Sequence, residues 1–131
     1  MRVRFSATAA LLALSVAASG CVAAAAAAGA GAGIYLTNQG AESLVDAPIA
    51  TVAERARIVM QQMNIAPAGT QTNGDGSERE LKGKTGDTDI TIELEAQSAS
   101  TTRLEVTARD NLVNYDKEMA RDIVERIVAA Q

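Results

Sequence analysis

The stretch Asp89-Ile-Thr-Ile-Glu-Leu-Glu-Ala96 alternates polar or charged residues with aliphatic ones. The stretch Thr102-Arg-Leu-Glu-Val-Thr-Ala-Arg109 repeats this pattern. Successive side chains of a strand point to opposite faces, so the alternation predicts two strands that are buried on one face only. We therefore expect an antiparallel sheet with one apolar face against a core and one charged face in solvent.

One register between these two strands satisfies both the apolar and the charge pattern. A shift by one residue would turn a whole strand over, so this register is strongly specified. It places Glu93 opposite Glu105, an unfavourable pair that the diagonal Arg103 relieves. The other expected pairs are Leu94 with Leu104, Ile92 with Val106, Glu95 with Arg103 and Asp89 with Arg109.

Two turn sequences extend the sheet towards the N-terminus. Asn73-Gly-Asp-Gly76 and Thr85-Gly-Asp-Thr88 tolerate positive φ angles and mark two hairpins, with an alternating strand at residues 78–84 between them. Further upstream, Ser43-Leu-Val-Asp-Ala47 is typical of a short strand that Pro48 stops.

An amphipathic helix is expected before the hairpins, because apolar residues recur at steps of three and four between residues 49 and 63. Thr51 followed by Glu54 has the spacing of a capping box, which predicts the start of the helix. Pro67 disfavours continuation beyond Ile65.

A second helix is expected at the C-terminus. Asn114 or Asp116 can cap it, and Asp122 with Arg126 forms a favourable i,i+4 pair. Its expected apolar stripe contains Met119, Ala120, Ile123, Ile127 and Ala130. Together the elements predict an α+β two-layer sandwich in the order β-α-β-β-β-β-α, with an antiparallel sheet of four to five strands and both helices on one face.

Composition separates this domain from the residues before it. The chain of 131 residues is 47% hydrophobic and only 2% aromatic, and half of its alanines lie in residues 1–33. With no His and one Cys, histidine-dependent catalysis, histidine-held or Cys-paired zinc and an intramolecular disulfide are excluded.

The first residues have the build of a secretory signal peptide. Met1-Arg-Val-Arg4 is followed by an uncharged run over residues 5–18. The run ends in Ala18-Ser19-Gly20-Cys21, which resembles the signal of a bacterial lipoprotein, although Ala18 stands where leucine is most usual. The resemblance implies that Cys21 is acylated and becomes the mature N-terminus, and several acyl chains would make a lasting anchor.

The residue after the cysteine is Val22 and not aspartate, so the lipoprotein resemblance implies the inner leaflet of the outer membrane, facing the periplasm. We expect a signal peptide at 1–20, an Ala/Gly-rich tether at 21–37 and a small α+β domain at 38–131. An alternative keeps the leader uncleaved, because the uncharged residues 5–41 are long enough to span a bilayer.

Net charge limits the class of partner. Subtracting Arg2 and Arg4 from 12 basic residues leaves 10 against 16 acidic ones, a net charge of −6 for the chain that begins at Cys21. Nucleic acid and anionic lipid surfaces both need a basic patch, so neither is expected to bind. We expect acyl chains on Cys21 to provide the membrane contact and an unidentified envelope protein to be the partner.

Candidate chemical sites are weak. Asn73, Asp75 and Ser77 alternate like the start of a calcium loop, but Glu78 and Lys84 stand where an EF-hand needs Gly and Glu. The candidate acid/base carboxylates lie on the solvated face, where a pKa near 4 is poor for catalysis at neutral pH; they are Glu93, Glu95 and Glu105. We therefore expect no enzyme activity, no metal and no cofactor.

The order of elements behind the cysteine and the Gly29-Ala-Gly-Ala-Gly33 stretch resembles a family of small proteobacterial lipoproteins of unknown function. That resemblance implies an anchor and a fold but no catalytic residues. Two functions remain open. The first is a non-catalytic structural or protein-interaction module of the envelope, and the alternative is a domain that binds or senses a small apolar ligand or lipid between sheet and helices.

Overall fold

The computed structural model describes residues 33–130. The predicted signal peptide, Cys21 and the tether up to residue 32 lie outside the described residues. Among those described, no helix is long and apolar enough to cross a membrane. Of the uncharged stretch 5–41, residues 35–36 and 40–41 belong to strands.

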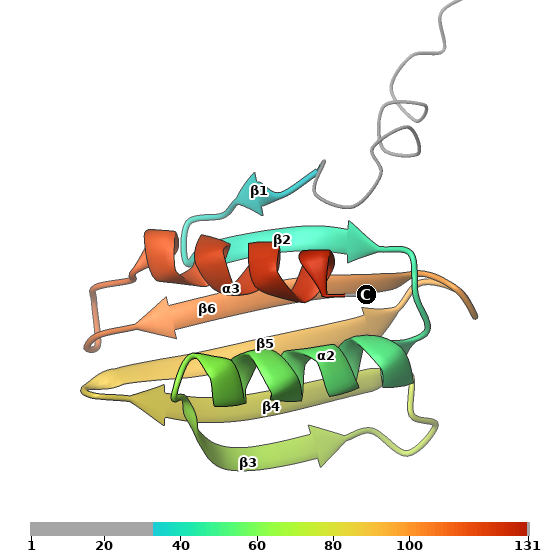
Figure 1. Ribbon diagram of the computed structural model, residues 1–131, viewed down its shortest axis with the longest axis horizontal. Helices are drawn as coiled ribbons and strands as arrows, with labels where there is room; N and C mark the ends of the chain where they lie inside the picture. The colour runs from blue at the N-terminus through green and yellow to red at the C-terminus, as the bar shows by residue number, and fades with distance from the viewer. Residues whose placement is uncertain (1–32, 131) are drawn as a thin grey trace, which may run out of the picture.

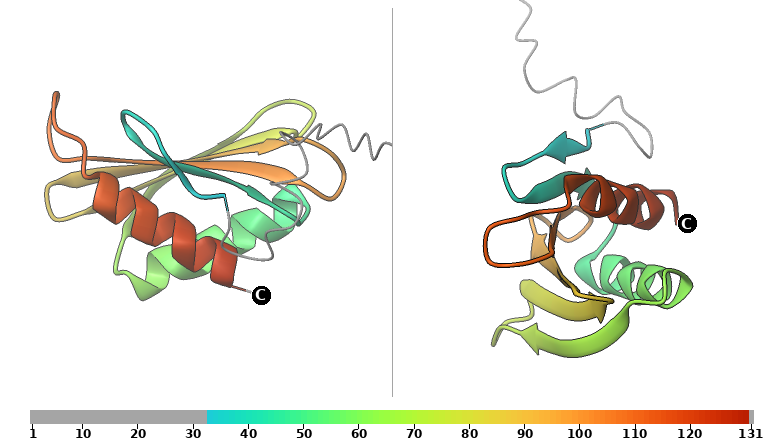
Figure 2. Two further views of the ribbon diagram at one scale, coloured as in Figure 1. Left: turned by 90° about the horizontal axis from the view of Figure 1, so that it is seen from above. Right: turned by 90° about the vertical axis from the view of Figure 1, so that its left-hand side faces the viewer.

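Within residues 33–130, six antiparallel strands form one sheet in the order β1-β2-β6-β5-β4-β3, and two helices cover one face of it (Figures 1 and 2). The α+β class and the arrangement of both helices on one face are confirmed. The elements are β1 (Tyr35–Leu36), β2 (Gly40–Val45), α2 (Ile49–Gln62), β3 (Ala66–Thr72), β4 (Glu78–Thr85), β5 (Thr88–Ala96), β6 (Thr102–Arg109) and α3 (Lys117–Ala129).

Over the described residues the sheet has six strands, one more than the five in the expected order of elements. The additional strand is β1, which pairs with β2. Both residues of β1 lie within residues 21–37, the range expected to be the tether. Strand β2 begins and ends earlier than the predicted range 43–47, because residues 40–45 pair with β6. Alternation could not locate β3, because all seven of its residues are exposed and none is charged.

The predicted register between β5 and β6 is confirmed. Leu94 lies opposite Leu104 and Ile92 lies opposite Val106, so their side chains are buried on the helix side. Both predicted hairpins are also present, and Gly76 and Gly86 have positive φ angles within them. The alternating sequence therefore determines which face of the sheet receives the helices.

The core lies between the sheet and the helices and consists of aliphatic side chains. α3 packs on β2 and β6, α2 packs mainly on β5 and β4, and the two helices contact each other. Small residues at the contact let α3 approach the sheet closely, since Ala41, Ala108 and Ala120 are fully buried. Thr102 is buried too, and its hydroxyl donates to the carbonyl of Ala47 at 2.8 Å.

The predicted capping box of α2 is wrong. Pro48 occupies the N-cap position without a side-chain hydrogen bond, and the backbone N–H of Thr51 donates to the carbonyl of Pro48. Thr51 therefore lies in the first turn and cannot cap it. Proline before the first turn has the fixed φ that a helix entry needs, so the start shifts to Ile49.

α2 ends at Gln62, earlier than Pro67 requires. Asn64 adopts a left-handed φ of 55°, and the N–H of Ile65 donates back to the carbonyl of Met60 at 2.8 Å. This pattern is a Schellman motif, in which a residue with positive φ satisfies the last carbonyls of the helix. The chain then turns into β3.

Asp116 caps α3 as predicted, because its carboxylate accepts from the N–H of Met119 at 2.9 Å. The predicted ion pair between Asp122 and Arg126 is also present, at 3.0 Å. The apolar stripe is wider than predicted, since Val124 and Val128 are buried beside the expected residues.

Candidate functional site

The outer face of the sheet, which we define as the face away from α2 and α3, carries a line of like charges. Glu42, Glu105, Glu93 and Glu80 lie directly opposite one another across β2, β6, β5 and β4. The same line reaches Gln71 in the edge strand β3. We call these four carboxylates the glutamate row.

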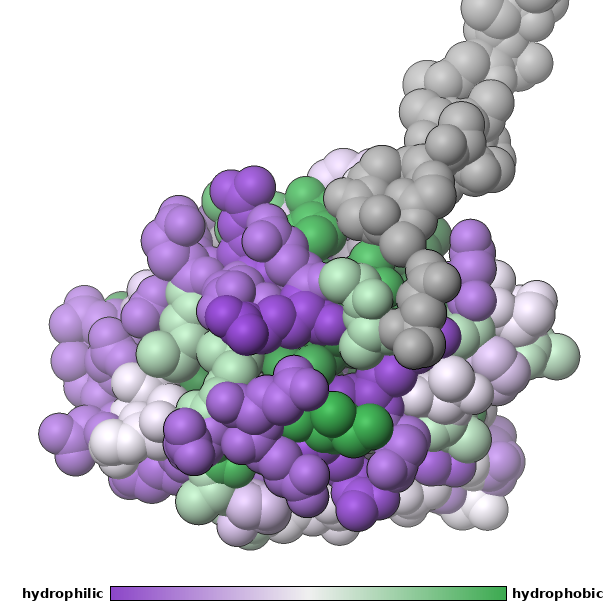
Figure 3. All heavy atoms as spheres, viewed as in Figure 1, coloured by the Kyte–Doolittle hydropathy of each residue, from purple (hydrophilic) through white to green (hydrophobic). Residues whose placement is uncertain are grey.

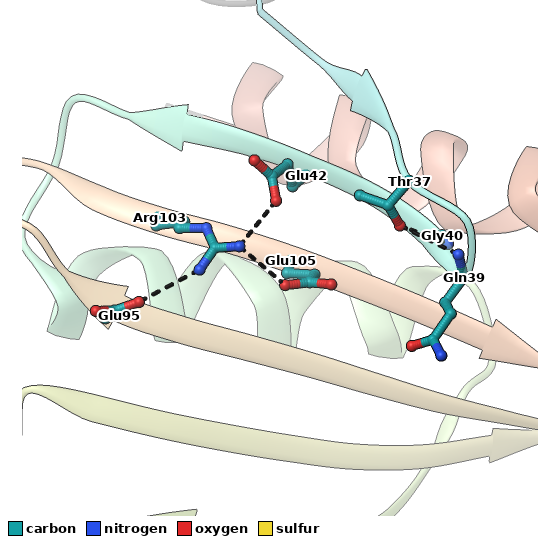
Figure 4. A network of polar contacts seen from close by, with 7 residues as sticks. All are labelled: Thr37, Gln39, Gly40, Glu42, Glu95, Arg103 and Glu105. Atoms are coloured by element: carbon teal, nitrogen blue, oxygen red, sulfur yellow. Dashed lines mark hydrogen bonds and ion pairs between the residues drawn. The ribbon is translucent and has the colours of Figure 1, made fainter.

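Arg103 lies beside this row and contacts two of its carboxylates, Glu42 and Glu105 (Figure 4). A second cation, Lys82, lies 3.1 Å from Glu80. The Nη2 of Arg103 donates to Oε2 of Glu42 at 2.9 Å and to Oε2 of Glu105 at 3.3 Å. Its Nη1 lies 3.5 Å from Oε2 of Glu95. One guanidinium thus bridges carboxylates of three adjacent strands.

These contacts change the protonation of the groups involved. The hydrogen bond to Glu42 and the attraction of that carboxylate raise the pKa of the Arg103 guanidinium. Partial desolvation, together with repulsion from Glu105 and Glu80, raises the pKa of Glu93 above 4.5. The expectation of an ordinary pKa is therefore wrong for Glu93, because its carboxylate is partly desolvated and its neighbours across the strands are also glutamates.

The outer face is hollowed over the glutamate row. The hollow has a volume of about 440 Å³ and is open to solvent. Glutamates from three strands line it together with Arg103, so a ligand in it would meet an excess of negative charge. Its lining comprises Gln71, Thr72, Asn73, Glu78, Arg79, Glu80, Glu93, Leu94, Glu95, Arg103 and Glu105.

A smaller hollow of about 130 Å³ lies between α2 and strands β3 and β4. Most of its exposed lining is apolar, contributed by side chains such as Met60, Pro67 and Leu81. The remaining lining residues are Arg57, Gln61, Gly69, Thr70 and Lys82. Edge strand β3 therefore has a hollow on each side of it.

The sequence candidate for a calcium loop is a hairpin turn. The carboxylate of Asp75 accepts from the N–H and the hydroxyl of Ser77, at 2.9 Å and 2.7 Å, and these bonds lower the pKa of Asp75. The side-chain oxygen of Asn73 accepts from the N–H of Glu78. In residues 33–130, no three acidic, cysteine or histidine side chains are grouped to hold a metal ion.

The structure brings together some of the candidate carboxylates and adds others. Glu93 and Glu105 are direct neighbours in the row, and Glu95 joins them through Arg103. Glu42 and Glu80 were not predicted as neighbours, because pairing was derived only for β5 and β6. Residues 78–84 also alternate, and placing their charged residues on the same face as Glu93 would have predicted Glu80 as a neighbour.

Comparison with protein families matches residues 3–130 to a family described as "Protein of unknown function (DUF3568)". The chain belongs to the DUF3568 family. The expectation of a family without assigned function is thereby confirmed. A search of curated proteins finds no match. In this DUF3568 protein, the features that bear on function are the N-terminal sequence with Cys21 and the charged outer face of the sheet.

The pKa of Glu93 generates a prediction. Changing Glu93→Gln should raise the free energy of unfolding by about 0.5 kcal/mol at neutral pH, because the folded state disfavours the ionised carboxylate among like charges. A carboxyl group whose pKa is higher in the folded than in the unfolded state lowers the stability of the folded state at pH values above its folded pKa. The difference in stability between the variant and the unchanged protein vanishes below pH 4.5, where the carboxyl group is protonated in both states. Urea denaturation of both proteins at neutral pH and below pH 4.5 measures the difference in stability.

Glu42→Gln is the matched control for that experiment. It removes a carboxylate that accepts from Arg103, so it should lower stability at neutral pH by a similar amount. If both variants lose stability at neutral pH, the repulsion assigned to the glutamate row is wrong.

Proposed function

We propose that this protein is a non-catalytic, lipid-anchored lipoprotein of the cell envelope that binds a protein partner through the outer face of its sheet. The glutamate row and the hollow above it are the observation that carries the proposal. The acyl chains on Cys21 hold the domain at the inner leaflet of the outer membrane, facing the periplasm.

The anchor half of the proposal rests on sequence. A basic N-terminus, an uncharged run and a small-residue junction precede the single cysteine of the chain. The net charge of −6 in the remaining chain gives no electrostatic attraction to anionic lipid, so the membrane contact has to come from the acyl groups.

The partner half rests on how charge is distributed between the two faces. The helix layer carries local ion pairs, namely Arg57 with Glu54, Arg121 with Glu125 and Arg126 with Asp122. Its surface is mostly hydrophilic, with scattered hydrophobic residues (Figure 3). The glutamate row has instead four aligned carboxylates, of which Glu42 and Glu105 share the Arg103 guanidinium and Glu80 pairs with Lys82. Four acidic groups thus face two cations, so a partner with basic groups gains electrostatic complementarity there.

The absence of histidine and the lack of a grouped donor set in residues 33–130 support a non-catalytic role. The alternative, a carrier of a small apolar ligand, receives less support. It needs space between sheet and helices, where the buried aliphatic residues pack against one another.

The anchor is tested by Cys21→Ala. Incorporation of labelled palmitate should be lost, and the protein should move from the membrane fraction to the soluble fraction, because no acyl chain remains to hold it. Cys21→Ser is the conservative second variant and should behave in the same way. Protein that stays in the membrane fraction without label would favour an uncleaved leader over lipid attachment.

The binding surface is tested by a photoreactive residue placed in intact cells. At Thr91, an uncharged position on the outer face beside the glutamate row, we expect a discrete crosslinked product. At Gln62, an exposed position at the end of α2, we expect none. Equal products from both positions, or a product from Gln62 alone, would contradict the assignment of the outer face.

A further inference from the structure

Strand β3 is an edge strand with an open side. Within residues 33–130 it pairs only with β4, and its seven residues are all exposed. An edge of this kind presents unpaired backbone N–H and C=O groups, which is the surface that an extended peptide needs to add a strand.

The usual protection of an edge is incomplete in β3. Proteins guard such strands with short length, charged side chains, proline or bulges. Pro67 and the irregularity between Pro67 and Gly69 protect the first half. The second half, Thr70-Gln71-Thr72, is regularly paired with β4 and carries no charge. The opposite edge, β1, is only two residues long.

Each face of β3 offers a place for side chains of an added strand. Side chains alternate along a strand, so a residue opposite Gln71 would lie on the outer face, next to the large acidic hollow. The residues on either side of it would point towards the helix layer. There the smaller, mainly apolar hollow includes Thr70 of β3 and Met60 of α2.

The glutamate row favours a positively charged segment as the added strand. It runs through four strands and ends at Gln71, so the next strand would place its own residue at the end of this line. We propose that an extended segment of an envelope protein, alternating basic and aliphatic residues, binds by adding a strand to β3. This inference rests on the proposed function and specifies the partner's chemistry.

Two other occupants complement this surface less well. A second copy of the domain would bring a further net charge of −6 to an already acidic face. The residues that precede the domain, within the uncharged stretch 5–41, supply no basic group. Both would still appear in the test below, as dimerisation or as an edge already protected before peptide is added.

The test uses the full-length protein purified in detergent and a synthetic peptide of alternating arginine and valine, long enough to span β3. Amide hydrogen exchange should slow about tenfold or more at residues 70–72 when the peptide binds, because edge N–H groups gain partners. A peptide of alternating glutamate and valine should not bind, because it meets the glutamate row with like charge.

Gln71→Lys is the decisive variant, since it places a cation at the end of the row and on the open edge. We expect it to weaken binding of the arginine–valine peptide about tenfold. Gln62→Lys, the same substitution at the end of α2, should leave the affinity unchanged. Unchanged slow amide hydrogen exchange in the buried parts of β5 and β6 confirms that each variant is folded.

The outcomes separate this inference from the proposed function. Peptide binding without protection of residues 70–72, or binding unaffected by Gln71→Lys, overturns strand addition. No peptide binding, edge protection before peptide is added, or dimerisation through β3 also overturns it. In all these cases a crosslink from Thr91 in cells would leave the outer face as the binding surface, whereas loss of that crosslink would overturn the proposed function itself.

Discussion

Pairing of Leu94 with Leu104 and of Ile92 with Val106 sends the aliphatic side chains of β5 and β6 towards the helices. The same pairing sends their carboxylates to the other side, because successive residues of a strand face opposite ways. The core and the charged outer face are therefore two consequences of one register. A slip of one residue would bury charges and expose the core, so the register cannot shift independently of the fold.

That register also has a cost. It places Glu93 between Glu105 and Glu80, and partial desolvation together with repulsion from these two carboxylates raises the pKa of Glu93. Arg103 offsets part of this by contacting three carboxylates at once, but exposed ion pairs contribute little stability. A row of aligned glutamates is thus explained poorly by stability alone. A basic partner would turn this repulsion into favourable contacts, which is why we propose this face as the binding surface.

Much of the fold was predictable from sequence, because β5, β6 and α3 have strong periodicity and Asp116 has the chemistry of a cap. The errors occur where local rules compete. The Thr51–Glu54 spacing suggested a cap, but Pro48 starts the helix earlier, and Asn64 ends it through a left-handed residue. β3 has no buried residue, so no alternation marked it. The glutamate row needs the pairing of four strands, which no single segment reveals, and Cys21 remains a prediction from sequence.

Arg103 is the cation that three carboxylates of the outer face share, and the most direct test of its role is the salt dependence of stability. Arg103→Met keeps the aliphatic part of the side chain and removes the cation. Urea denaturation at low salt should show a free energy of unfolding about 1 kcal/mol lower than that of the unchanged protein. Most of this loss should disappear at about 1 M NaCl, where charges are screened beyond about 3 Å. Arg121→Met, which removes a single exposed pair with Glu125, should change little. An equal loss for Arg103→Met at both salt concentrations would contradict this role.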